Sequence, residues 1–150
     1  ITGGEPCVFD WSELINYIAK FSHIKFHLET SGAFEIKGKF DWVTVSPKKN
    51  KLPLAENIKT ANEIKIIVEN ENSINEWLDT FPEIKEKPIV YLNPEWSKAN
   101  DSIVLNAITS FVKKNPNFRV GYQLHKLFKA DSLDKNSKPE IPLGGKINVS

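Results

Sequence analysis

Strand-like and helix-like patterns of apolar residues alternate along most of this 150-residue chain. Residues 63–68, for example, read Glu-Ile-Lys-Ile-Ile-Val, a short β-branched run that is typical of a buried strand. Residues 101–114 instead place apolar side chains at helical spacing behind Asp101, a residue type that favours helix N-termini. Because strands that alternate with helices build parallel sheets, the sequence predicts an α/β domain with a mostly parallel sheet.

The same patterns predict the order of the elements. We expect strands at residues 1–4 (the tail of a strand), 24–29, 40–45, 63–68, 88–92 and 118–122. We expect helices at residues 10–21, in a short stretch ending near 60, and at 73–81, 101–114 and 123–128. In helix 101–114 the side chains expected to face inward are Ile103, Leu105, Ile108, Phe111 and Val112. Because the composition turns polar at Lys129, we expect one domain over residues 1–128 and a polar C-terminal tail over 129–150.

Polar residues follow most of the expected strands. In parallel α/β sheets ligands bind at the carboxyl ends of the strands, so these segments are the candidate site. They are Gly3-Gly4-Glu5-Pro6, Glu29-Thr30-Ser31-Gly32, Ser46-Pro47-Lys48, Glu69-Asn70, Asn93-Pro94-Glu95 and Gln123-Leu124-His125-Lys126.

The Gly3-Gly4-Glu5-Pro6 segment suits an ammonium ligand. Paired glycines let a ligand approach the backbone closely and permit positive φ, and Pro6 stiffens the exit. Glu5 would add a carboxylate at the same spot. The competing interpretation is an ordinary glycine turn after a strand, with Glu5 capping the following helix or pairing with a lysine.

The composition restricts the remaining possibilities. Twenty basic and nineteen acidic residues give a net charge of +1, which does not favour a nucleic-acid partner. No apolar run approaches the roughly 20 residues of a membrane span. A single cysteine, Cys7, cannot form an internal disulfide, which fits a cytoplasmic protein. Since the chain has no methionine, we expect it to be a fragment whose N-terminal portion is missing.

Taken in order, the strand-end segments resemble those of the 7-carboxy-7-deazaguanine synthases, which are radical S-adenosylmethionine (SAM) enzymes. The Gly-Gly-Glu-Pro segment is similar to the radical SAM motif that holds the amino group of SAM. Further matches are Ser46-Pro47-Lys48, the strand entry at residues 61–65, Tyr91-Leu92-Asn93-Pro94 and Gln123-Leu124-His125-Lys126. The resemblance extends to about Phe128 and implies part of a modified (β/α) barrel.

The resemblance implies a ring contraction within queuosine biosynthesis. In this family, SAM is cleaved at a [4Fe-4S] cluster to a 5′-deoxyadenosyl radical that abstracts hydrogen from 6-carboxy-5,6,7,8-tetrahydropterin. Rearrangement with loss of ammonia gives 7-carboxy-7-deazaguanine, and Mg²⁺ assists. The resemblance also implies a homodimer that acts on a small pterin substrate, makes no direct contact with nucleic acid and does not associate with a membrane.

The resemblance also assigns roles to individual residues. SAM contacts are implied for Gly3, Gly4, Glu5, Ser46, Pro47, Lys48, Gln123, Leu124, His125 and Lys126. Substrate contacts are implied for Thr2 and Glu29, and the residues themselves leave open that Glu29 pairs with Lys25 or Lys48 instead. No catalytic residue and no metal ligand is assigned, because the three cluster cysteines and the magnesium ligand of the family have no counterpart here.

Because one cysteine replaces three, we expect the chain alone to bind no cluster and to be inactive. Two alternatives remain. One is a different radical SAM enzyme, such as a glycyl-radical activase. The other is a barrel remnant without a cluster that acts as a binding module.

Overall fold

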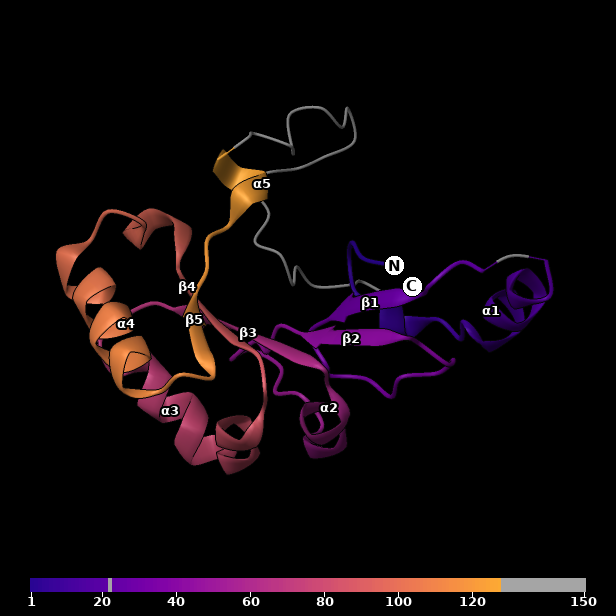
Figure 1. The fold of residues 1–150 in the computed structure, drawn as a ribbon, viewed down its shortest axis with the longest axis horizontal. Helices are drawn as coiled ribbons and strands as arrows, with labels where there is room; N and C mark the ends of the chain where they lie inside the picture. The colour runs from indigo at the N-terminus through magenta and orange to yellow at the C-terminus, as the bar shows by residue number, and fades with distance from the viewer. Residues whose placement is uncertain (22, 128–150) are drawn as a thin grey trace.

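A five-stranded, all-parallel sheet forms the centre of the computed structural model, which describes residues 1–21 and 23–127 (Figure 1). The strands lie side by side in chain order: β1 (His27–Thr30), β2 (Trp42–Val45), β3 (Glu63–Val68), β4 (Val90–Pro94) and β5 (Phe118–Val120). The predicted α/β class and parallel sheet are therefore confirmed. Within the described residues the sheet is open, with β1 and β5 at its two edges, and it does not close into a barrel.

Helices lie between β2 and β3, between β3 and β4 and between β4 and β5, as the sequence predicts, and further helical segments precede β1 and follow β5. They are η1 (Pro6–Val8), α1 (Ser12–Ala19), α2 (Ala55–Thr60), α3 (Ser73–Thr80), η2 (Pro82–Glu86), η3 (Trp96–Lys98), α4 (Ser102–Lys114) and α5 (Leu124–Leu127). Helix α1 is shorter than the helix predicted at residues 10–21. The Asp10 carboxylate accepts a hydrogen bond from the Ser12 N–H at 2.9 Å, but it lies one residue before Trp11, the N-cap of a helix that begins at Ser12. The predicted tail over residues 129–150 lies outside the described residues.

The two faces of the sheet differ sharply in burial. Along β3, Ile64, Ile66 and Val68 are fully buried, whereas Glu63, Lys65 and Ile67 alternate with them and are only partly buried. Helices α2, α3 and α4 lie together on one side of the sheet (Figure 1) and pack on this apolar face. The opposite face therefore carries the charged side chains of the strands.

Helix α4 corrects one prediction. Val104 and Ile108 are buried, and Phe111 and Val112 pack against the same core. Ile103 and Leu105, predicted to face inward, are 59% and 37% exposed. The reason is geometric, because residues 104, 108, 111 and 112 share one helical face while 103 and 105 fall on either side of it.

The first residue of the chain pairs with the sheet beyond β1. The Ile1 amino group donates to the His27 carbonyl at 2.6 Å, and the Ile1 carbonyl accepts from the Glu29 N–H at 3.0 Å. This alternation is that of parallel strands, so residues 2–5 leave the sheet at its carboxyl edge. Among the described residues, no helix combines the length and apolar character that crossing a membrane requires.

Adjacent isoleucines of β3 test which face the helices cover. Ile66 has no exposed surface, whereas Ile67 points to the opposite, polar face. We expect Ile66→Ala to lower the free energy of unfolding by about 2–5 kcal/mol, because it leaves a cavity in the core. Ile67→Ala should cost clearly less. Urea unfolding of both variants measures the difference, and equal costs would contradict this assignment of the two faces.

Candidate functional site

The strand-end segments singled out by the sequence all lie at the carboxyl edge of the sheet, because every strand runs in the same direction. Thr2 to Glu5 follow Ile1, Glu29 lies in β1, Ser46 to Lys48 follow β2, and Gln123 to Lys126 follow β5. The first three of these segments are neighbours. The fourth lies at the far edge of the sheet, four strand positions from β1, a distance of about 19 Å at the usual strand spacing.

The two glycines before Glu5 provide an open approach to the backbone. Gly3 and Gly4 have φ values of 89° and 55°, a region that side chains with a Cβ rarely adopt. A Cβ built on either residue would meet no other atom within 4 Å, and both residues are exposed. Thr2 beside them is exposed as well. The backbone of residues 2–4 is thus accessible to a ligand, as the ammonium hypothesis requires.

The carboxylate of Glu5 joins its own loop to the end of β1. It accepts hydrogen bonds from the Cys7 N–H at 3.1 Å, from the Ser31 N–H at 3.0 Å and from the Thr30 and Ser31 hydroxyls. Glu5 thereby caps η1, which is the interpretation the sequence left open beside a direct ligand contact. Four donors occupy the usual capacity of a carboxylate.

These contacts also set the charge of Glu5. Burial by itself raises the pKa of the carboxyl group, but the hydrogen bonds from Ser31, Thr30 and the backbone of Cys7 together outweigh it. The net pKa lies below the ordinary value of 4.5. Glu5 is therefore ionised at neutral pH and contributes a negative charge to this edge of the sheet.

Lys48 brings a partly buried cation to the same place. Its Nζ donates to the Ser46 carbonyl and to the Ser46 hydroxyl, both at 2.8 Å, and the Ser46 N–H donates to the Thr30 carbonyl at 2.8 Å. Burial lowers the pKa of Lys48, and the negative charges of Glu29 and Glu5 partly offset that effect. Since its hydrogen bonds go to neutral oxygens, the ammonium remains suited to a ligand carboxylate.

Glu29 is paired with a lysine that the sequence did not indicate. Its Oε2 lies 2.9 Å from the Nζ of Lys65 on β3, which also lies 3.7 Å from Glu63. The predicted alternatives, Lys25 and Lys48, are not the partner in this pair, and Lys25 instead contacts Asp41 at 2.9 Å. Lys65 was missed because it is distant in sequence and meets Glu29 only across β2. Strand alternation offers the one available signal, since it places Lys65 on the polar face.

Asn93, one of the predicted strand-end residues, meets Gly121, a glycine that sequence reasoning left out of the site. Asn93 is buried near the end of β4, and its Oδ1 lies 2.0 Å from where a Cβ of Gly121 would stand. Gly121 therefore leaves the space that the Asn93 amide fills. Beside them, the rings of Trp96 and Tyr122 pack edge to face with centroids 5.9 Å apart. The sequence predicted that the strand ends before Asn93 and Pro94, but β4 includes both residues, and the close approach of Gly121 was not visible in the sequence.

The segment after β5 is only partly described. Gln123 is partly buried, Leu124 is exposed, and residues 124–127 form α5. The side chain of His125 lies outside what the structure describes. The structure therefore places the described part of this segment at the predicted edge of the sheet.

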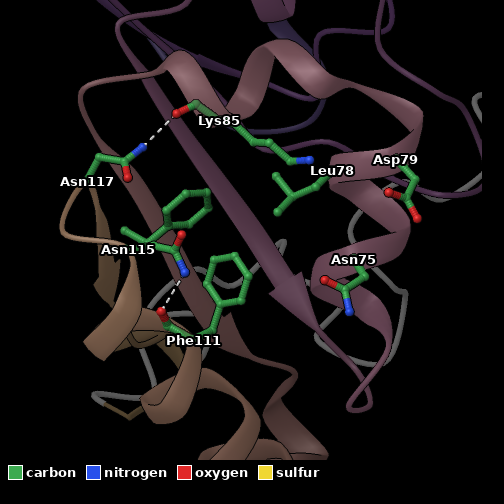
Figure 2. A pocket seen from close by; sticks show the side chains of 8 residues that line it. Asn75, Leu78, Asp79, Lys85, Phe111, Asn115 and Asn117 are labelled. Atoms are coloured by element: carbon green, nitrogen blue, oxygen red, sulfur yellow. Dashed lines mark hydrogen bonds between the residues drawn. The ribbon is translucent and has the colours of Figure 1, made fainter.

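A pocket away from the strand ends lies on the other side of the molecule's sheet. A pocket of about 270 Å³ opens between α3 and α4, on the helical side of the sheet (Figure 2). Its lining residues are Asn75, Leu78, Asp79, Lys85, Phe111, Asn115, Asn117 and Phe118. The amide of Asn117 is already committed to the carbonyls of Lys85 and Lys87, both at 3.0 Å. Because none of the strand-end residues lines this pocket, it is not part of the candidate site.

The groups at this edge suit the two charged ends of an amino acid. The accessible glycines and the Lys48 ammonium match the amino and carboxylate groups of a bound amino acid. A cluster needs several thiolates, whereas Cys7 is the one cysteine of the sequence and is buried. Within residues 1–21 and 23–127, no group of three His, Cys, Asp or Glu side chains is arranged to hold a metal.

Comparison with known proteins supports the resemblance. The chain is 37% identical over 126 residues to the 7-carboxy-7-deazaguanine synthase of Flavobacterium psychrophilum, covering 84% of this chain and 59% of that protein. It is 35% identical to the synthase of the same name from Synechocystis, with coverages of 84% and 59%. The crystal structure of QueE from Escherichia coli superposes with a TM-score of 0.65 at 32% identity, over 82% of this chain and 55% of that one. No protein-family model matches the chain.

The predicted similarity to the 7-carboxy-7-deazaguanine synthases is therefore confirmed, at both the sequence and the structural level. The chain spans about three fifths of the length of the curated relatives it matches.

Replacing Glu5 by glutamine tests whether this carboxylate holds the loop to β1. The variant keeps one acceptor but turns an NH₂ group toward donors, so we expect the free energy of unfolding to fall by about 1–3 kcal/mol at neutral pH. A carboxyl group whose pKa is lower in the folded than in the unfolded protein stabilises the fold at every pH above its unfolded pKa. This stabilisation is lost as the pH falls through the folded pKa. The difference between wild type and Glu5→Gln should therefore shrink below pH 4.5.

Chemical denaturation of both proteins between about pH 3 and pH 7 measures this difference, because that range spans the ordinary pKa values of carboxyl groups. A glutamine variant as stable as the wild type at pH 7 would show that the four hydrogen bonds do not anchor the loop.

Proposed function

We propose that this chain is the SAM- and substrate-contacting part of a 7-carboxy-7-deazaguanine synthase. The observation that carries the proposal is the gathering of Glu5, Glu29, Ser46 and Lys48 at one edge of the sheet, in a chain whose curated relatives bear that name. The reaction proposed is the radical SAM ring contraction of 6-carboxy-5,6,7,8-tetrahydropterin to 7-carboxy-7-deazaguanine.

In this proposal the chain's own residues bind and orient. Lys48, held by Ser46, pairs with the carboxylate of SAM as a point charge. The exposed backbone of Gly3 and Gly4 receives its ammonium group, with the negative charge of Glu5 close behind. Glu29 has one oxygen engaged by Lys65, which supports a role for the other as an acceptor for the substrate or a ribose hydroxyl.

The remaining assignments stay proposals. Gln123 to Lys126 would complete the SAM site from the far edge, and Thr2 would contact the pterin. SAM supplies the radical when bound, and the [4Fe-4S] cluster and Mg²⁺ would be held by residues beyond those of this chain. We further propose a cytoplasmic homodimer with no direct contact with nucleic acid.

Lys48 provides the direct test of SAM binding. We expect Lys48→Met to weaken SAM binding by about tenfold to a hundredfold, because a charge-assisted hydrogen bond contributes roughly 1.5–3 kcal/mol. Calorimetric titration of SAM into the complete enzyme measures this. Lys51→Met is the matched control, since Lys51 lies in the same loop but places its ammonium over the Phe34 ring. Equal SAM affinity of the Lys48 variant and the wild type would refute the assigned role.

The chain alone should bind no [4Fe-4S] cluster and show no ring-contraction activity, because one thiolate cannot replace three. Anaerobic reconstitution of the 150-residue chain with iron and sulfide, followed by absorbance and iron analysis, checks this. One cluster per chain would overturn the expectation.

A further inference from the structure

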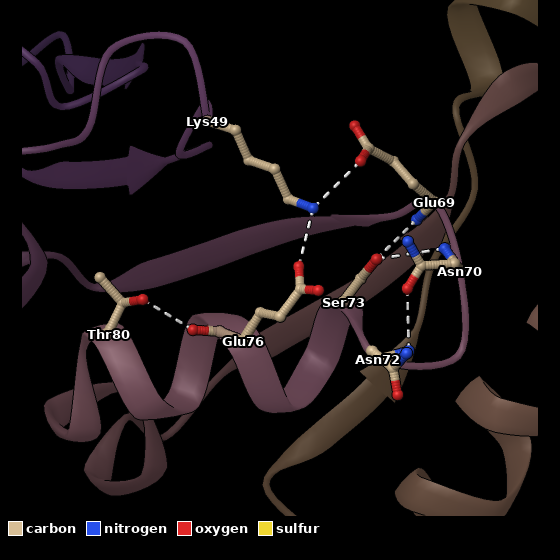
Figure 3. A network of polar contacts seen from close by, with 7 residues as sticks. All are labelled: Lys49, Glu69, Asn70, Asn72, Ser73, Glu76 and Thr80. Carbon is tan, nitrogen blue, oxygen red and sulfur yellow. Dashed lines mark hydrogen bonds and ion pairs between the residues drawn. The ribbon is translucent and has the colours of Figure 1, made fainter.

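Two adjacent lysines after β2 have opposite surroundings. Lys48 turns toward the strand ends, where its Nζ donates to the carbonyl and hydroxyl of Ser46. Lys49 reaches the other way, toward the β3–α3 connection, where its Nζ lies 2.8 Å from Glu76 and 3.2 Å from Glu69 (Figure 3). One short segment is thus held on two sides.

The two carboxylates that pair with Lys49 belong to backbone that is held by hydrogen bonds at the β3–α3 connection. Glu69 directly follows β3, and its N–H donates to the hydroxyl of Ser73 at 3.1 Å, as does the N–H of Asn70. Ser73 itself has no exposed surface. Glu76 lies in the first turn of α3, where the helix dipole favours a negative charge. The ion pair therefore connects the loop to the core rather than to another mobile side chain.

Besides this ion pair, the loop has a buried Pro47, the Lys51 ammonium over the Phe34 ring and two backbone contacts. The Ser46 N–H donates to the Thr30 carbonyl, and a single antiparallel bridge joins Lys48 to Lys51. Both contacts act on the backbone close to β2. Within the part of the chain that the structure describes, the Lys49 side chain joins this segment to the neighbouring βα unit through its contacts with Glu69 and Glu76.

We propose that Lys49, paired with Glu69 and Glu76, is a positioning residue that holds the Ser46–Lys48 segment and so aims the Lys48 ammonium at its ligand. For SAM as that ligand, the inference rests on the proposed function. Lys49 itself touches no ligand and acts through Lys48. The three side chains are 43–50% exposed, so the effect on affinity is modest.

The first test needs no ligand. Amide hydrogen exchange of residues 46–51 in the complete protein should accelerate by about twofold to fivefold in Lys49→Met, as expected for loss of an exposed ion pair. Lys49→Arg should restore slow exchange. Lys25→Met is the matched control, because it breaks an equally short pair with Asp41 before β1 and should leave this segment unchanged. Unchanged exchange in Lys49→Met overturns the proposal.

The second test is a double-mutant cycle on SAM affinity. Lys49→Met should weaken binding by about twofold to fivefold in the wild-type background and have no further effect in the Lys48→Met background. The melting temperature should fall by the same amount in both backgrounds when Lys49 is replaced. An equal loss of affinity in both backgrounds would mean that Lys49 acts independently of Lys48, which overturns the proposal. If the wild-type protein binds no SAM, the proposed function fails, and hydrogen exchange alone decides whether Lys49 holds the segment.

Discussion

Parallel pairing of neighbouring strands is the constraint on which the rest of this structure depends. Because β1 to β5 all run in the same direction, the loops that leave them gather at one edge of the sheet. The backbone of Ile1 extends this pairing beyond β1 and thereby delivers the glycines and Glu5 to the same edge. Without that register, Glu5 and Lys48 would not lie at the same edge of the sheet.

One face of the sheet is apolar and packed, and the other carries charged side chains. Fully buried side chains such as Ile66 and Leu92 face α2, α3 and α4 and form the core. The other face and the carboxyl edge hold charges in close proximity, with Lys65 between Glu29 and Glu63. Charged groups that are paired and stay partly solvated keep part of their hydration, so this arrangement costs less than burying them unpaired in the core.

Anchoring of loops by side chains is the second recurring feature. Glu5 ties its loop to the end of β1 through Thr30 and Ser31, and Lys49 ties the next loop to the β3–α3 unit. Each contact joins one βα unit to its neighbour at the edge where ligands are expected. A binding group on a loop is useful only if the loop has a defined position, and these contacts define it.

The sequence by itself determined the elements and the class of fold. The alternation of hydrophobic patterns predicted β3 at its observed bounds, Asp101 marked the start of α4, and the motifs indicated the family. Those signals are local, because they arise from spacing along the chain. Which residues meet was decided by tertiary structure. Glu29 pairs with Lys65 across β2, Glu5 caps its own loop, and Asn93 occupies the space that Gly121 leaves. These contacts join residues distant in sequence or depend on side-chain direction, so only the register of the strands and the path of the loops could settle them.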